Sequence, residues 1–304
     1  MKRSMGSLRK WVGVGIAGLF ALTAGVAQAA SAAADDAGNY TEVTFTNGAN
    51  LGTGFGAWQF NVGELAVVDL ADSTTATGDI NSTNDLAFRF YGGTNYTYAE
   101  ATRDFNAALA VGDEFSLSMA YNWGGGVRGV NILTASGSEL LNLNYGSDTL
   151  SYTFSGSSAQ NAFTNYVSTA TVAVVVRQLA GNQLEVTLTR NDGLTTNFVS
   201  TTLTAPAAKV KFYNGGHSGD NVNYALFINN LAITPAPALA LTGHDAMAVG
   251  MTNLLTLTRN GPSLGAATFD LASSAPGVAA VPASVDFNAG SASTTFPVVA
   301  YAFG

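Results

Sequence analysis

Two runs decide the fold: residues 167–190 read VSTATVAVVVRQLAGNQLEVTLTR, and residues 208–234 read AKVKFYNGGHSGDNVNYALFINNLAIT. The first run contains two segments in which every second residue is apolar. These residues are Val172, Val174 and Val176 in one segment and Leu184, Val186 and Leu188 in the other. A period of two sends successive side chains to opposite faces of a strand, so each set predicts a half-buried β-strand. Gly, Asn and Asp fill the gaps, as they do in turns.

Similar short runs precede this stretch. The candidate strands are residues 40–46, 66–70, 85–91, 96–105, 114–123, 129–134, 140–145 and 149–154. In the run 114–123, Phe115, Leu117 and Met119 are predicted to face the core. About a dozen strands without an amphipathic helix predict an all-β fold, an antiparallel sandwich or jelly roll over residues 39–234.

Composition fits an exported all-β protein. Apolar residues make up 47% of the 304 residues, charged residues only 11%, and there is no cysteine, so the fold depends on core burial without disulfides. Four of the twelve basic residues lie within residues 1–29, which leaves 8 basic against 20 acidic residues and a net charge of −12. An acidic surface without a basic cluster argues against nucleic acid and anionic membranes as partners.

Residues 1–29 have the pattern of a secretory signal peptide. A basic start with Lys2, Arg3, Arg9 and Lys10 precedes an apolar core over 11–26 and a small-residue cleavage motif at 27–29. The apolar run is shorter than the roughly 20 residues that a membrane span needs. The sequence therefore predicts export, to the medium or the cell surface, with no membrane span in the mature chain.

The remaining chain divides at prolines. Residues 30–38 are expected to form a spacer. Residues 235–238 (PAPA) are expected to form a linker, because proline cannot donate to a strand ladder. Residues 239–304 predict a second, smaller β module, with strands at 255–258 and 268–272.

Both modules resemble known families. Residues 39–234 resemble the concanavalin A-like lectin/glucanase superfamily in its laminin-G-like form, found in exported bacterial surface proteins. The segments that carry the resemblance are 99–105 (AEATRDF), 111–117 (VGDEFSL), 126–133 (GVRGVNIL), 212–216 (FYNGG) and 226–231 (LFINNL). The last two look like the closing hairpin of such domains. Residues 280–290 (AVPASVDFNAG) and 293–298 (STTFPV) resemble bacterial immunoglobulin-like or Calx-β-like repeats, and we expect this module to be incomplete.

The glucanases of the superfamily place catalytic carboxylates on one strand face, about 5–5.5 Å apart in retaining enzymes. The sequence does not have their Glu-x-Asp-x-x-Glu spacing. Its nearest acidic pairs are Glu100 with Asp104, which could share a strand face, and Asp113 with Glu114, which point opposite ways. We therefore expect a protein that is not an enzyme.

Sugar binding requires an aromatic surface with planar polar groups beside it. The candidate ligand-binding residues are Trp123, Arg128, Asn131 and Tyr213, of which the first two flank a Gly-rich loop. Lectin-like and laminin-G-like domains often bind a calcium ion at a loop rim, so the resemblance allows one here, and the alternative is a solvated acidic loop. Asp220 and Asn221 are the candidate calcium ligands, with Asp69, Asp72 or Asp79 as further carboxylates.

The sequence thus predicts a non-catalytic, exported lectin-like protein whose partner is an extracellular polysaccharide or a cell-surface or matrix component. One alternative is a structural surface or adhesin module without a small ligand. Another is a degenerate polysaccharide hydrolase or lyase. The concave sheet face discriminates among them: an exposed tyrosine or tryptophan platform there favours the lectin, a smooth Thr/Ser/Val face the structural module, and a clustered pair of carboxylates the enzyme.

Overall fold

The computed structural model divides the chain into two compact units, one ending at Ala236 and the other beginning at Pro237. The structure describes residues 32–93, 97–122, 126–146, 148–165, 167, 169–216, 224–236, 238–243, 247–260, 267–288 and 291–302. The predicted signal peptide lies outside these residues. In the part of the chain that is described, no helix is long and apolar enough to cross a membrane.

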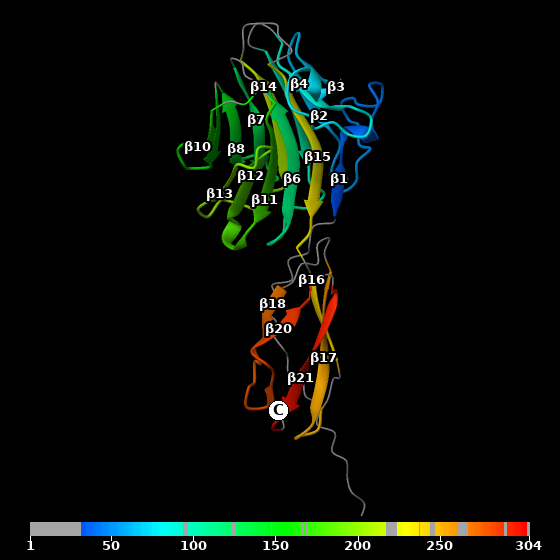
Figure 1. Cartoon of the computed structure of the whole chain (residues 1–304), viewed down its shortest axis with the longest axis vertical. Coiled ribbons are helices and arrows are strands. Elements are labelled where there is room, and N and C mark those ends of the chain that lie inside the picture. The colour runs from blue at the N-terminus through cyan, green and yellow to red at the C-terminus, as the bar shows by residue number, and fades with distance from the viewer. Residues whose placement is uncertain are drawn as a thin grey trace, which may run out of the picture. The chain divides into compact units, whose positions relative to one another are not determined.

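The larger unit is an all-β sandwich of two antiparallel sheets, stacked face to face (Figure 1). In spatial order, one sheet contains β13 (Thr195–Val199), β12 (Leu184–Arg190), β11 (Thr171–Gln178), β6 (Glu114–Tyr121), β15 (Leu226–Thr234), β4 (Ala87–Tyr91) and β3 (Val67–Ala71), and its eighth strand β1 (Ala33–Asp35) pairs with β15. The other contains β10 (Gln160–Thr164), β9 (Thr149–Phe154), β8 (Glu139–Gly146), β7 (Val127–Leu133), β14 (Lys209–Gly215), β5 (Tyr98–Asp104) and β2 (Gln59–Val62). Short 3-10 turns are η1 (Ala37–Asn39), η2 (Ser73–Thr75) and η3 (Ala180–Asn182).

The alternation in β11 and β12 has the predicted effect. All six of the predicted inward residues of these strands are fully buried, and in the register Val174 lies opposite Leu188 on β12 and Leu117 on β6. Phe115 and Met119 of β6 face the same core. The predicted antiparallel all-β sandwich of the jelly-roll kind is therefore confirmed in the structure.

Aromatic side chains fill the space between the two sheets at the β4 end. The rings of Phe88 on β4 and Trp58 have centroids 4.9 Å apart, and Trp58 lies 5.8 Å from Phe212 on β14 of the opposite sheet. Each of the three is fully buried. Aromatic residues bury large apolar areas, so this cluster joins the two layers.

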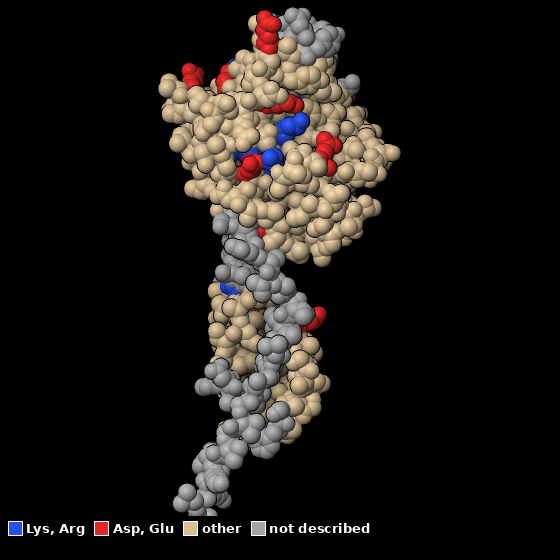
Figure 2. Space-filling model, turned by 180° about the vertical axis from the view of Figure 1, so that it is seen from behind, with Lys and Arg blue, Asp and Glu red and all other residues tan. Residues whose placement is uncertain are grey.

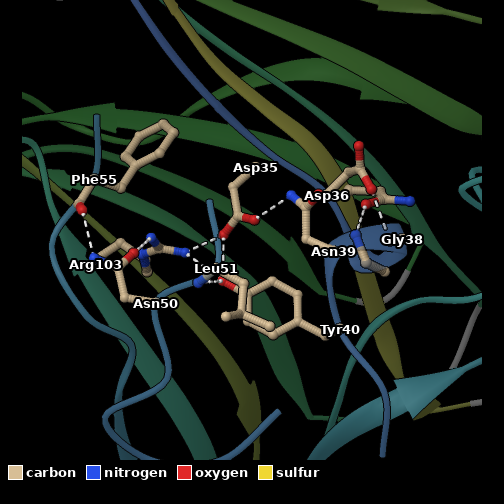
Figure 3. Close-up of polar contacts among 11 residues, drawn as sticks. Asp35, Asp36, Gly38, Asn39, Tyr40, Asn50, Leu51, Phe55 and Arg103 are labelled. Carbon is tan, nitrogen blue, oxygen red and sulfur yellow. Dashed lines mark hydrogen bonds and ion pairs between the residues drawn. The ribbon is translucent and has the colours of Figure 1, made fainter. Parts of the chain in front are cut away.

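The prediction that residues 30–38 form a spacer is wrong, because Ala33–Asp35 forms β1 and pairs with the end of β15. The Asp35 carboxylate is fully buried and forms an ion pair with the equally buried Arg103 of β5 (Figure 3). Tyr40 Oη donates to Asp35 at 2.9 Å, and Arg103 also donates to Asn50 Oδ1 at 2.8 Å. A buried arginine needs such partners, and they hold the N-terminal segment in the sandwich.

Residues 40–46, a predicted strand, form turns instead. The Thr44 hydroxyl accepts a hydrogen bond from the Thr41 backbone N–H at 2.8 Å, and Phe45 N–H donates to Thr41 O at 2.9 Å. Such hydroxyl contacts offer the backbone an alternative to the ladder. Tyr40 and Phe45 are thereby both buried, 5.3 Å apart between ring centroids.

The predicted closing hairpin is also wrong. β14 pairs with β5 and β7, whereas β15 pairs with β4, β6 and β1 of the other sheet. Asn214 of β14 points into the sandwich and donates to Phe90 O at 2.7 Å on β4. The chain therefore crosses between layers after β14, and apolar runs alone do not reveal which sheet a strand joins.

The smaller unit is built from a four-stranded and a two-stranded antiparallel sheet. Its strands are β16 (Ala238–Thr242), β17 (Thr252–Asn260), β21 (Ser293–Ala300) and β19 (Ala279–Ala280) in one sheet, and β18 (Ala267–Asp270) and β20 (Ser284–Phe287) in the other. Leu257, Phe287 and Val298 form its core. β16 begins at Ala238, the last residue of the expected linker. The immunoglobulin-like character of this unit stays a prediction.

Candidate functional site

The outward side of the seven-stranded sheet carries two continuous rows of polar side chains, which we call the polar face. The first, the Tyr213 row, follows the register across all seven strands through Asn61, Glu100, Tyr213, Gly129, Asn144, Ser151 and Asn161. At a strand spacing of about 4.8 Å this row is roughly 29 Å long.

The second row lies two residues away along each strand. This Asn131 row runs through Gln59, Thr102, Lys211, Asn131, Asn142 and Thr153. The core-facing neighbours of these residues, such as Val130 and Leu143, are fully buried. The strict alternation of strands therefore separates an apolar inner face from a polar outer one.

The central residues of the polar face are almost completely covered by their neighbours. Asn61 and Asn161 at the two edges are exposed, whereas Tyr213 and Asn131 on the central strands are 7% and 3% exposed although they point away from the core. Figure 2 looks onto this face and shows acidic and basic side chains adjoining one another near its middle.

Tyr213 reaches across two strands of the sheet. Its hydroxyl lies 2.7 Å from Asn142 Oδ1 and 3.0 Å from Asn144 Oδ1, and it donates to one of them at a time. Burial, followed by the negative charge of Glu139, raises the pKa of the Tyr213 phenol far above its ordinary value. At neutral pH the phenol is therefore a hydrogen-bond donor and not a base.

Two ion pairs cross from β14 to β5. Lys211 Nζ lies 3.2 Å from Glu100 Oε1, and Lys209 Nζ lies 3.0 Å from Asp104 Oδ1. Asn61 also donates to the second oxygen of Glu100 at 3.0 Å. The third carboxylate on this side, Glu139, accepts a hydrogen bond from Asn131. Every charged group of the polar face thus has a partner.

Tyr98 adds an exposed aromatic ring beside the Tyr213 row. It pairs with Gly215 in the register, and a Cβ placed on Gly215 would lie 2.5 Å from Tyr98 Cδ1. The ring therefore lies over the glycine, while 42% of Tyr98 remains exposed. The side chain combines an accessible ring with a fixed position.

The outward side of the other sheet is chemically different. Its central register row joins Ser116 of β6, Val175 of β11 and Thr187 of β12. The next row along contains Glu114, Arg177 and Glu185, whose charged groups lie 3.5–3.7 Å apart at the end of these strands. This is the smooth Ser/Thr/Val face that the structural alternative requires.

The structure places the predicted ligand-binding residues differently. Asn131 and Tyr213 lie together on the polar face. Arg128, by contrast, points between the sheets, where it is fully buried and donates to Asn122 O at 2.8 Å, with its guanidinium 5.8 Å from the Tyr145 ring. Trp123 lies outside the described residues.

The candidate calcium ligands Asp220 and Asn221 also lie outside the described residues. Asp69 pairs with Arg89 at 2.8 Å, Asp72 caps η2 by accepting from Thr74 N–H at 2.9 Å, and Asp79 accepts from Asn81 N–H at 3.0 Å. No three Asp, Glu or His side chains within the described segments come close enough together to hold a metal ion. Calcium binding stays a prediction.

Four residues of the polar face were not predicted from the sequence as candidate site residues: Tyr98, Lys211, Asn142 and Asn144. The segment 139–146, ELLNLNYG, contains the signal that could have found two of them. Because Leu141, Leu143 and Tyr145 face the core, Asn142 and Asn144 between them must face outward. For Tyr98 and Lys211, the pairing of β5 with β14 was needed.

The sequence matches no protein-family model and no curated protein. Among solved structures, it is similar in fold to a cellulose-induced protein (14% identity, 66% of this chain and 95% of that chain, TM-score 0.42). It is also similar to the alginate lyase from Corynebacterium sp. (12%, 53% and 81%, TM-score 0.36) and to the Lotus tetragonolobus seed lectin (11%, 59% and 93%, TM-score 0.35). At such identities the likeness concerns the fold alone and says nothing of the ligand of this chain.

Proposed function

We propose that residues 33–236 form a non-catalytic carbohydrate-binding module of an exported or cell-surface protein, and that a polysaccharide lies along the polar face. The observation that carries this proposal is the pair of polar rows that crosses the seven-stranded sheet. Sugar hydroxyls both donate and accept hydrogen bonds. Asparagine side chains do the same, with a carbonyl oxygen and an NH₂ group in one plane.

Tyr98 supplies the apolar component of recognition. The C–H groups on one face of a sugar ring are apolar, and an exposed aromatic ring beside amide side chains can cover them. Tyr98 lies over Gly215 and next to the Tyr213 row, while Asn144 of that row lies three strand spacings, about 14 Å, across the sheet. A polysaccharide that stacks one sugar on Tyr98 would therefore reach Asn144 with a neighbouring sugar. This arrangement favours a binding protein over a purely structural module.

The spacing of the carboxylates supports a non-catalytic role. Glu100 and Asp104 lie four residues apart on β5, so their Cα atoms are about 14 Å apart. Asp104 and Glu139 stand in one register row but three strand spacings apart, which is again about 14 Å. Glycoside hydrolases place their two carboxyl groups about 5–10 Å apart. Glu100 and Asp104 are also both held by lysines.

Binding of the purified full-length protein to a panel of polysaccharides, with calcium and with chelator, tests this proposal. We expect binding that Tyr98→Ala weakens about tenfold, equivalent to roughly 1.4 kcal/mol. Tyr301→Ala is the matched control, because Tyr301 is 58% exposed but belongs to the smaller unit. Loss of binding in chelator would assign the ligand to a calcium-dependent loop site. Failure to bind any glycan would refute the proposal and leave the structural surface module.

A further inference from the structure

Every basic side chain after the predicted signal peptide is already engaged. All eight of these residues are described by the structure. Six form ion pairs with carboxylates: Arg89, Arg103, Arg177, Arg190, Lys209 and Lys211. The other two, Arg128 and Arg259, are buried and donate to backbone carbonyls. Among the described residues, therefore, an external anion finds no lysine or arginine that does not already have a partner.

Both basic residues of the polar face are engaged in this way. Lys211 and Lys209 are only 32% and 20% exposed in their side chains, and each is in contact with a β5 carboxylate. Together with Glu139, the face carries three carboxylates against two ammonium groups, on a mature chain with a net charge of −12. A polyanion that approaches this face meets a net negative charge, which slows its association and opposes its binding.

A bound anion would either lie beside one of these carboxylates at like charge or compete with it for its lysine. If a uronate took Lys211, Glu100 would lose its cation while three-quarters of its side chain stays buried. A carboxylate buried to this extent that keeps only the Asn61 amide as a partner is unfavourable. A neutral sugar avoids this penalty, since its hydroxyls can donate to Glu100 and accept from Lys211 while the ion pair remains intact.

We infer that the ligand of the polar face is a neutral polysaccharide, and that the Lys211–Glu100 and Lys209–Asp104 ion pairs act as a filter that excludes polyuronates. This inference rests on the proposed carbohydrate-binding function. It assigns to the two ion pairs a role in specificity, in addition to any contribution to the stability of the sheet.

The test uses the full-length protein and two sets of probes: neutral β-glucan, mannan and xylan, and the polyuronates alginate and polygalacturonate. Affinity electrophoresis at low and high salt measures binding. We expect retention by a neutral glycan that salt leaves unchanged, because no net charge is neutralised, and no retention by either polyuronate.

Glu100→Gln is the decisive variant, because it removes the negative charge that pairs with Lys211 and keeps a side chain of the same size. We expect it to gain roughly tenfold in polyuronate affinity at low salt and to lose this gain at high salt. Asp69→Asn is the matched control: it makes the same charge change and frees Arg89 on the other sheet. Asp69→Asn should not gain affinity for the polyuronates.

The outcomes separate the two proposals. Salt-sensitive binding of the unaltered protein to a polyuronate would overturn the neutral ligand class and keep the carbohydrate-binding function. An equal gain in Glu100→Gln and Asp69→Asn would overturn the filter, since net charge alone would then explain it. If no glycan of either class bound, the proposed function itself would fail, and the ligand class with it.

Discussion

The hydroxyl of Tyr213 occupies the space that a side chain on Gly129 would need. A Cβ placed on Gly129 would lie 2.8 Å from Tyr213 Oη and 1.9 Å from Leu143 O. The two residues are register partners on β14 and β7. Only because residue 129 lacks a side chain can the phenol cross β7 and reach the two asparagines of β8.

Gly129→Ala is therefore expected to destabilise the protein by about 1–3 kcal/mol, because the methyl group must push the β8 carbonyl away. Chemical denaturation of the full chain measures the change. Gly146→Ala serves as the control, because its Cβ would meet nothing closer than 3.6 Å. If the two variants had equal stability, close packing at Gly129 would not be a constraint.

Asn144→Ala is expected to weaken polysaccharide binding by roughly three- to tenfold, the effect of losing about one hydrogen bond to the ligand. Isothermal titration calorimetry on the glycan found in the panel measures it. Asn197→Ala on β13 removes an amide from the opposite sheet, where it donates to Thr187 Oγ1 at 2.8 Å, and should leave binding unchanged. Equal losses in the two variants would place the ligand elsewhere.

Asp35→Asn is expected to cost about 3–5 kcal/mol of stability, because it leaves the Arg103 charge buried without its carboxylate. The double variant Asp35→Asn with Arg103→Met should recover much of this loss, since no buried charge remains. Arg177→Met is the surface control: its side chain is 45% exposed, and such ion pairs contribute at most about 1 kcal/mol. Urea unfolding compares the variants, and an unchanged midpoint for Asp35→Asn would contradict the prediction.

The raised pKa of Tyr213 predicts a loss of stability in alkali. Its folded pKa lies above that of the unfolded phenol, about 10, so its contribution is complete below pH 10 and is lost as pH rises toward the folded pKa. We expect the free energy of unfolding to fall by up to about 1.4 kcal/mol per pH unit for this group, and to fall less steeply in Tyr213→Phe.

Part of the decline should remain in that variant. Burial, and next the charge of Asp35, also raise the pKa of Tyr40. Urea unfolding between about pH 9 and pH 11 gives the two slopes. Identical slopes with and without the Tyr213 hydroxyl would mean that this phenol ionises as easily in the folded protein as in the unfolded one.

The strands of the sandwich could be predicted from the sequence wherever one face of the strand is apolar. In β6, β11 and β12 the alternation gave both the strand and its inward face, because a period of two leaves no other way to bury Leu117, Val174 and Leu188. β2, β10 and β13 have few apolar residues and lie at or near sheet edges, where little burial is required. Their sequences therefore carry a weak signal.

The candidate site was less predictable because it depends on pairing between distant strands. Asn131 and Tyr213 could be singled out by residue type, but only the register of β7 with β14 brings them together. Arg128 shows the converse. Its position next to a Gly-rich loop suggested exposure, whereas its place in the alternation of β7, with Val130 and Ile132, sends its side chain inward.

The pairing of β1 with β15 determines when this unit can fold. Ala33 lies opposite Ile233, so the first strand of the sandwich has its partner in the last. The eight-stranded sheet therefore cannot be completed until the chain as far as Ile233 is available for folding. Such long-range pairing makes folding slow, and it favours one late event over growth strand by strand. It also brings the two ends of the unit side by side, an arrangement that tolerates insertion into a longer chain.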